Sequence, residues 1–300
     1  MIQLYNGDND TWRFCWHGGA FFEFVLGDGT VIITDPYQYG SKRGYVKDNT
    51  KYASEIITGC DYVLLSHTHF DHAQDLPAIV NRFPDSILIV PDDAYVSLMM
   101  RQGHNPFLSR IQPVGHQDRL EFEEFRLDTY RGKHTVLSVN DPVMKGHEED
   151  FVQGVPYMEQ EKYRAEEGTF DTVKGMFDVE AAMAFRNYQL TLPTGESILI
   201  WGGEFDHDYR RFLYKDMKPD LMLLQLAATN VGGDRNHPKI DRLVDFMRLV
   251  NPKHVIPQHQ ENFSWDILEN ISLMCNRMLN NEKSEISYFN LSPSKWYMVK

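Results

Sequence analysis

Ser66-His67-Thr68-His69-Phe70-Asp71-His72 is the stretch from which the fold and the chemistry of this chain are best predicted. Four of its side chains are strong metal ligands, and they fall within six residues. An apolar run at residues 62–65 leads into the stretch and predicts a buried strand, and residues 73–82 have a helical pattern. We therefore expect a metal-binding loop between a strand and a helix.

The spacing within this loop predicts two metal positions. His67 and His69 are two residues apart, so in an extended chain they point the same way and can bind one metal. Asp71 and His72 follow where the chain turns into the helix, and they can face a second metal. Imidazole nitrogen and carboxylate oxygen suit zinc, manganese and iron. The alternative, a chance cluster of surface histidines, is disfavoured by the apolar strand that precedes them.

The composition indicates a globular protein and argues against a nucleic-acid partner. The 300 residues are 42% hydrophobic and 24% charged, which is enough for one large domain or two small ones. Nucleic-acid binders are usually basic, so the formal net charge of −13 argues against a nucleic-acid partner. We expect a small-molecule substrate, and the sequence leaves a homo-oligomer open.

The cysteines and the N-terminal residues predict a cytoplasmic location. Cys15, Cys60 and Cys275 are far apart and odd in number, so we expect a reducing compartment and no disulfide framework. Residues 1–8 lack the basic start and apolar core of a signal peptide. No apolar run approaches the roughly 18 residues that a membrane helix needs, so we expect no membrane association.

Strands and helices alternate around the loop. Residues 21–26 and 30–34 read as a hairpin with an Asp28-Gly29 turn, and His17 stands in the loop before it. This order predicts an α/β layered architecture. Further strands are expected near residues 86–90, 119–122, 125–130, 188–192, 197–201, 221–226 and 286–291, and helices near 92–102, 236–250 and 265–279.

The order His-x-His-x-Asp-His after an apolar strand resembles the signature of the metallo-β-lactamase superfamily. Pro257-Gln258-His259 and Asp35-Pro36-Tyr37 resemble its ascorbate-6-phosphate lactonase-like branch most. The resemblance implies a four-layer αββα sandwich of two mixed β-sheets flanked by helices. Residues 1–300 would form one such domain, with a lid or contact segment inserted at about residues 140–185.

The resemblance also implies a ligand set. The first metal would be held by His67, His69 and His134, and the second by Asp71, His72 and His259. Relatives commonly bridge the metals with the Asp of a Gly-Asp pair, but this chain has Gly203-Glu204 there. Either Glu204 or Asp206 would bridge, and the strand alignment favours Glu204. If neither residue bridges the metals, binding of the second metal is weakened.

Three further residues are implied around the ligands. Asp35 would support the metal loop from behind, although a turn carboxylate before proline is an equal alternative. His17 and His237 would contact the substrate; the alternatives are a loop histidine and a histidine at a helix start.

Two metals can share one water and lower its pKa toward neutrality, which makes a nucleophile without a reactive serine. The first hypothesis is therefore a hydrolase of a lactone or related carbonyl ester, with two divalent ions, zinc above manganese or iron. Asp71 would also move a proton in catalysis. A phosphodiesterase of the same fold is the second hypothesis. The third is a non-catalytic binding protein with a degenerate metal site.

Overall fold

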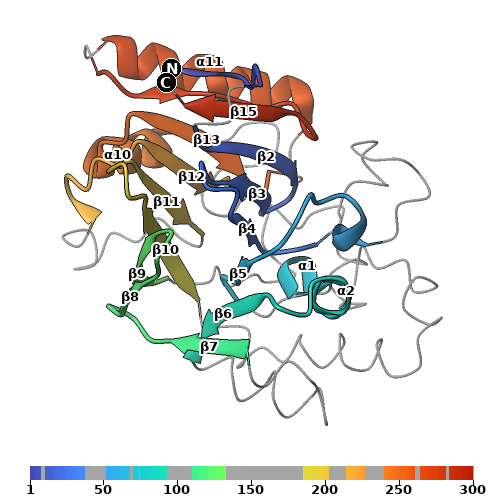
Figure 1. Cartoon of the computed structure of the whole chain (residues 1–300). Coiled ribbons are helices and arrows are strands. Elements are labelled where there is room, and N and C mark those ends of the chain that lie inside the picture. The colour runs from blue at the N-terminus through green and yellow to red at the C-terminus, as the bar shows by residue number, and fades with distance from the viewer. Residues whose placement is uncertain are drawn as a thin grey trace, which may run out of the picture.

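The computed structural model describes residues 1–7, 11–37, 52–67, 70–73, 75–92, 110–132, 185–202, 214–226, 240–260, 264–281 and 284–299. Within these ranges the side chains of Phe70, Asp71 and Pro77 are not described. The described residues form two β-sheets with helices on their outer faces (Figure 1). The segment predicted as an insertion, residues 140–185, lies outside the described residues except for Phe185.

The first sheet contains eight strands in the spatial order β1-β15-β2-β3-β4-β5-β6-β7. They are β1 (Ile2–Leu4), β2 (Arg13–Gly18), β3 (Phe21–Val25), β4 (Val31–Thr34), β5 (Tyr62–Leu64), β6 (Ile87–Pro91), β7 (Ile111–Val114) and β15 (Trp296–Val299). Strands β4 to β7 are parallel, and the pairs from β1 to β4 are antiparallel. The parallel strands β4, β5 and β6 therefore end at one edge of the sheet.

The second sheet contains seven strands in the order β14-β13-β12-β11-β10-β9-β8. They are β8 (Arg119–Glu121), β9 (Arg126–Arg131), β10 (Arg186–Thr191), β11 (Ser197–Trp201), β12 (Leu221–Gln225), β13 (His254–Gln258) and β14 (Ser287–Tyr288). Strands β11 to β14 are parallel, and β8 to β11 pair antiparallel. Both sheets are thus mixed, as the resemblance implied.

Side-chain alternation along the buried strands produces three apolar layers. In β5, Tyr62 and Leu64 join the core between the sheets, while Val63 joins the core under the first helices. In β12, Leu223 faces the same central core and Met222 faces the opposite outer core. Two outer cores and one central core mean four layers, which confirms the predicted αββα architecture.

The helices cover the two outer faces. The 3-10 turn η1 (Ala53–Glu55), α1 (Phe70–Ala73) and α2 (Leu76–Arg82) lie beside the first sheet. The helices α10 (Asp241–Val250) and α11 (Trp265–Asn281) cover the second sheet (Figure 1). None of the described helices is long and apolar enough to cross a membrane.

The structure corrects several predicted elements. His17 belongs to a strand, β2, because this segment is held between β3 and β15 and is buried on both faces. The helix expected at 73–82 is two helices, since Asp75 turns inward between them and its carboxylate accepts the Ala53 amide at 2.9 Å. Helix α10 begins at Asp241 rather than near residue 236. Strands β1, β7 and β15 were not predicted.

Two hydrogen bonds join the sheets beside the predicted metal-binding loop. The Tyr188 hydroxyl donates to the Leu65 carbonyl at 2.7 Å, and the Arg186 amide donates to the Ser66 carbonyl at 2.9 Å. Burial, together with the negative charge of Asp35, raises the pKa of Tyr188 well above its usual value. The hydroxyl therefore keeps its proton, and strand β10 is tied to the segment that follows β5.

We predict that Tyr188→Phe lowers the free energy of unfolding by about 1–3 kcal/mol, because it leaves the buried Leu65 carbonyl without this donor. Urea denaturation measures the change. The control is Tyr297→Phe, whose hydroxyl interacts with Ser292 near the surface and whose loss should stay within about 0.5 kcal/mol. Equal losses in the two variants would contradict the proposed importance of the inter-sheet bond.

We predict that none of the three cysteines reacts with a thiol reagent in the native protein. Cys15, Cys60 and Cys275 are buried, and burial raises the pKa of each thiol to about 12. The thiols therefore stay protonated at pH 8, and the reactive thiolate forms only after unfolding. Labelling followed by mass spectrometry should give no adduct in buffer and three in urea. Rapid native labelling would contradict the buried placement.

Candidate metal centre

Three of the predicted ligands meet where strands of both sheets end. His67 follows β5, His72 lies in α1, and His259 follows β13. The ring centroids of His67 and His72 are 4.0 Å apart, and those of His72 and His259 are 5.0 Å apart. His67 and His72 are buried, while His259 is partly exposed. The fold thus brings together imidazoles separated by almost two hundred residues of sequence.

Asp35 organises this group from behind. Its Oδ1 accepts the Ser66 amide at 2.7 Å, and its Oδ2 accepts the Ser66 hydroxyl at 2.7 Å. Oδ2 also lies 2.9 Å from Nδ1 of His72. The carboxylate is almost fully buried, and its backbone has a positive φ of 38°. Few residues adopt that conformation, and aspartate is one that tolerates it.

These hydrogen bonds assign the tautomers of two histidines. The Ser66 hydroxyl donates its only hydrogen to Asp35, so it must accept the hydrogen bond that it shares with Nδ1 of His67 at 2.9 Å. The carboxylate accepts from Nδ1–H of His72 in the same way. In both rings Nε2 is then the nitrogen able to coordinate a metal. A histidine that donates its other N–H to a carboxylate or hydroxyl is typical of metal sites, so these residues fit a metal.

The turn between β2 and β3 holds the third imidazole. The His259 amide donates to the Gly19 carbonyl at 2.9 Å, and Trp16 Nε1 donates to the same oxygen at 3.0 Å. His259 itself has a positive φ of 54°, a conformation that is uncommon outside glycine and that histidine adopts more readily than most residues. The first sheet therefore positions a ligand that the second sheet carries.

His17 is engaged within the first sheet. Its Nε2 lies 3.0 Å from Oε2 of Glu23, and its Nδ1 lies 3.9 Å from Sγ of Cys15. Glu23 is fully buried, and its Oε1 accepts the amide and the hydroxyl of Thr58. A substrate contact by His17 stays a prediction and would require one of these interactions to break. The sequence carried a signal for this pairing that was missed: Glu23 is a lone carboxylate within an apolar strand.

A small cavity of about 10 Å³, with space for about one water, lies beside His72 and His259. It is lined by Ala20, Asp35, Ser66, His72, Phe185, Arg186, Ile200, Gly202, Gln225, Gln258 and His259. Gln258 donates from Nε2 to the Trp201 carbonyl at 2.8 Å, and its buried Oε1 has no partner among the described residues. The two glutamines were not predicted as site residues, because their place depends on strand register.

The other predicted site residues lie outside the described part of the chain. They are His69, His134, Glu204, Asp206 and His237, and of Asp71 only the backbone, in α1, is described. Among the described residues, no group of three or more His, Cys, Asp or Glu side chains is placed so that it could hold a metal ion. The two-metal ligand set and the bridging carboxylate therefore stay predictions.

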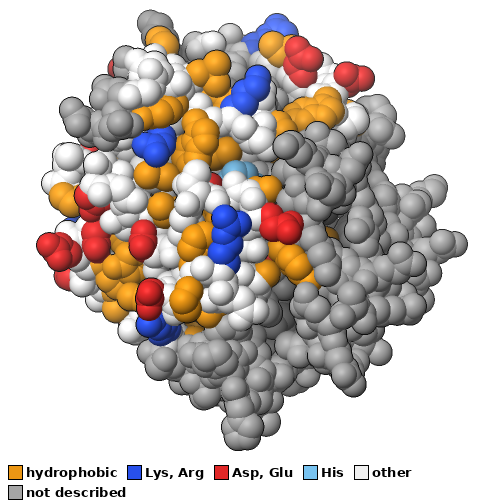
Figure 2. All heavy atoms as spheres, turned by 45° about the vertical axis from the view of Figure 1, so that its right-hand side comes forward, with side chains coloured by type: hydrophobic (Ala, Val, Ile, Leu, Met, Phe, Trp, Pro, Cys, Tyr) orange, Lys and Arg blue, Asp and Glu red, His pale blue; other side chains and the backbone are white. Residues whose placement is uncertain are grey.

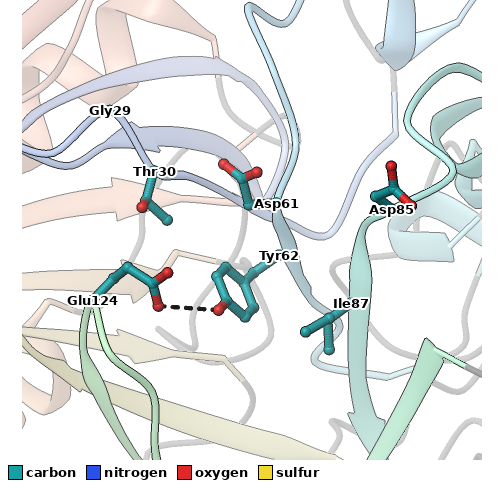
Figure 3. Close-up of a pocket in the computed structure, with 7 residues that line it drawn as sticks. All are labelled: Gly29, Thr30, Asp61, Tyr62, Asp85, Ile87 and Glu124. Atoms are coloured by element: carbon teal, nitrogen blue, oxygen red, sulfur yellow. Dashed lines mark hydrogen bonds between the residues drawn. The ribbon is translucent and has the colours of Figure 1, made fainter.

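A larger hollow of about 390 Å³ lies at the opposite end of β5 and is acidic (Figure 3). The hydroxyl of Tyr62 donates to Glu124 at 3.1 Å, and burial raises the pKa of Tyr62 to about 12. Asp61 accepts the Val31 amide at 2.7 Å, and Asp85 pairs with an arginine at 2.5 Å. These groups are already engaged, so the hollow offers no reactive arrangement despite its size.

Comparison with known proteins agrees with the fold. Residues 13–259 match the family described as the beta-lactamase superfamily domain. No curated protein matches the chain. The metallo-beta-lactamase fold protein YhfI from Bacillus subtilis has 12% identity and a TM-score of 0.56, over 96% of this chain and 99% of that one.

Two other similar structures differ in chemistry. A possible metal-dependent hydrolase from Veillonella parvula has 15% identity and a TM-score of 0.51, over 95% of this chain and 98% of that one. CmlA, a diiron beta-hydroxylase from Streptomyces venezuelae, has 11% identity and a TM-score of 0.54, over 94% of this chain and 53% of that one. At these identities the likeness concerns the fold alone, and a fold does not select a reaction.

We predict that Asp35→Asn weakens metal binding about 10–100-fold, the usual cost of losing a partner of a metal-bound histidine. Asparagine tolerates the positive φ, but its NH₂ group cannot accept the hydrogen bonds that His72 and Ser66 donate to Oδ2 of Asp35. Competition with a coloured chelator measures the affinity. Asp61→Asn is the control, since Asp61 accepts a backbone amide at the other end of β5. Equal affinities in both variants would argue against the role of Asp35.

Proposed function

We propose that the chain, which belongs to the beta-lactamase superfamily, is a metal-dependent hydrolase of small ester-like substrates. The observation that carries the proposal is the hydrogen-bond network of Asp35 and Ser66. Through it, two buried imidazoles carry their protons on Nδ1 and keep Nε2 for a metal.

His67, His72 and His259 are the described residues that would hold metal. His69, His134, Asp71 and a carboxylate at 204 or 206 complete the proposed set of two divalent ions, with zinc as the favoured metal. When bound, such ions lower the pKa of a coordinated water and polarise the bond under attack. The donor set of imidazole and carboxylate suits zinc, manganese and iron alike.

The chain's own residues would orient and move protons. Asp35 and Ser66 hold two imidazoles in place, and the Gly19 carbonyl holds the backbone of His259. Asp71 would take the proton of the attacking water and pass it to the leaving oxygen. The small cavity beside Gln258 would give one water a place next to His72 and His259.

A lactone or related carbonyl ester is the substrate class we propose. The formal net charge of −13 disfavours a polyanionic polymer. On the face that Figure 2 shows, the Lys and Arg side chains of the described residues are scattered singly instead of gathered in one stripe. Three free, buried cysteines support the cytoplasm as the compartment.

We predict close to two metal ions per chain after expression with added zinc and manganese, measured by plasma mass spectrometry. His67→Ala should lower the content because it removes a ligand. His254→Ala is the matched control, since His254 lies at the start of β13 and its ring faces Phe289. A wild-type protein without metal would reject the hydrolase proposal.

The metal-loaded protein should then hydrolyse lactone reporters faster than phosphodiester reporters, and His67→Ala should abolish the reaction. A preference for phosphodiesters would move the proposal to the phosphodiesterase alternative. Full metal content without turnover of either class would support a binding protein.

A further inference from the structure

Phe185 covers one of the candidate ligands. It precedes β10, is 1% exposed, and its ring centroid lies 4.7 Å from that of His67, with 34° between the ring planes. The Ser66 hydroxyl restrains only Nδ1 of His67, at 2.9 Å. The tilted ring contact with Phe185 adds a restraint on rotation of the imidazole about its bond to Cβ, beside the contact with the His72 ring at 4.0 Å.

Two glycines enclose the Phe185 ring. Gly132 follows β9 and Gly202 follows β11, and these strands flank β10 on either side. A Cβ atom at Gly132 would lie 2.3 Å from Cδ1 of Phe185, and one at Gly202 would lie 2.3 Å from Cζ. Neither distance is compatible with a side chain, so the ring packs directly against the backbone of both neighbouring strands.

The backbone around Phe185 is held as firmly as its ring. The Gly132 amide donates to the Phe185 carbonyl at 2.9 Å, and the Arg186 amide donates to the Ser66 carbonyl at 2.9 Å. The buried Arg186 guanidinium donates to the carbonyls of Val114 at 3.2 Å and Phe185 at 3.1 Å. Phe185 therefore cannot move without disturbing both sheets.

We propose that Phe185 is a positioning residue for the metal centre. Its ring restrains the plane of the His67 imidazole, and the two glycines hold that ring in place. In the sequence, a predicted ligand follows each glycine two residues later, His134 after Gly132 and Glu204 after Gly202. This role rests on the proposed function, because it concerns the orientation of metal ligands.

The first test replaces the flat ring and keeps its volume. Phe185→Met fills the space with a flexible chain, so the protein should fold while His67 loses the ring contact. We expect metal affinity to fall about 10–100-fold, as for other residues that orient a ligand, and the visible absorption bands of the cobalt-loaded protein to change. Chelator competition and absorption spectroscopy are the measurements.

The matched control is Phe125→Met. Phe125 is 2% exposed, and its ring contacts Tyr62 and Phe122 near the start of β5, whereas His67 follows the end of that strand. This variant should lose similar thermal stability and keep the wild-type affinity and cobalt spectrum. Unchanged affinity and spectrum in Phe185→Met, with a wild type that binds metal, would overturn the positioning role and leave the proposed function intact.

A second test concerns packing and needs no metal. Gly202→Ala should lower Tm by several degrees, because its Cβ meets the ring, and the same change in a Phe185→Ala background should cost much less. If the Tm losses of Gly202→Ala and Phe185→Ala simply add in chelator-treated protein, the two residues are not in contact and the enclosure of the ring is contradicted. A wild type that binds no metal would reject the proposed function together with the positioning role, while the packing test would still report on the ring.

Discussion

Ser66 is the residue through which the two sheets and the candidate metal centre depend on each other. Its amide and hydroxyl both donate to Asp35 behind β4, and its carbonyl accepts the Arg186 amide at the start of β10. Its hydroxyl also accepts the hydrogen bond from Nδ1–H of His67. One ordinary hydrogen bond contributes only about 1 kcal/mol, but a buried polar group left without a partner costs about 1–3 kcal/mol. A shift of Ser66 would leave several such groups unpaired at once.

Buried carboxylates recur wherever a long connection meets the first sheet. Asp35 accepts from Ser66, Glu23 accepts from Thr58, and Asp75 accepts from Ala53. In each case a carboxylate bonds a backbone amide of a segment far away in sequence. Hydrogen bonds to an ionised group are stronger than those between neutral groups. The segments that flank the site are thereby held without needing regular secondary structure.

Local patterns predicted the elements that have local signals. The hairpin of β3 and β4 has an Asp-Gly turn, and β5 ends in a ligand-rich loop, so both were found. Strand β2 was missed because Cys15 and His17 are as buried as Phe14 and Trp16, which removes the alternation of polar and apolar residues. The short strand β1 forms only by pairing with β15, almost three hundred residues away, and no local pattern encodes that contact.

The candidate site shows the same division. His67 and His72 were predicted from the spacing within residues 66–72 and His259 through a family resemblance, and the fold brings the three together. The partners that orient them were less visible, apart from Asp35. Phe185 and Gln258 lie beside the site because of the direction of their side chains at the ends of strands. That direction depends on the register between β9, β10 and β11 for Phe185, and between β12 and β13 for Gln258. The glycines at 132 and 202 read as ordinary loop residues until the ring between them is seen.

The position of β15 between β1 and β2 has a consequence for biosynthesis. Residues 296–299 lie beside strands formed by residues 2–4 and 13–18, and both ends of the chain meet there (Figure 1). On the ribosome, the earliest part of the first sheet must therefore wait for nearly three hundred further residues before its edge can close. Such distant pairing slows folding, so the nascent chain carries an open strand edge throughout its synthesis.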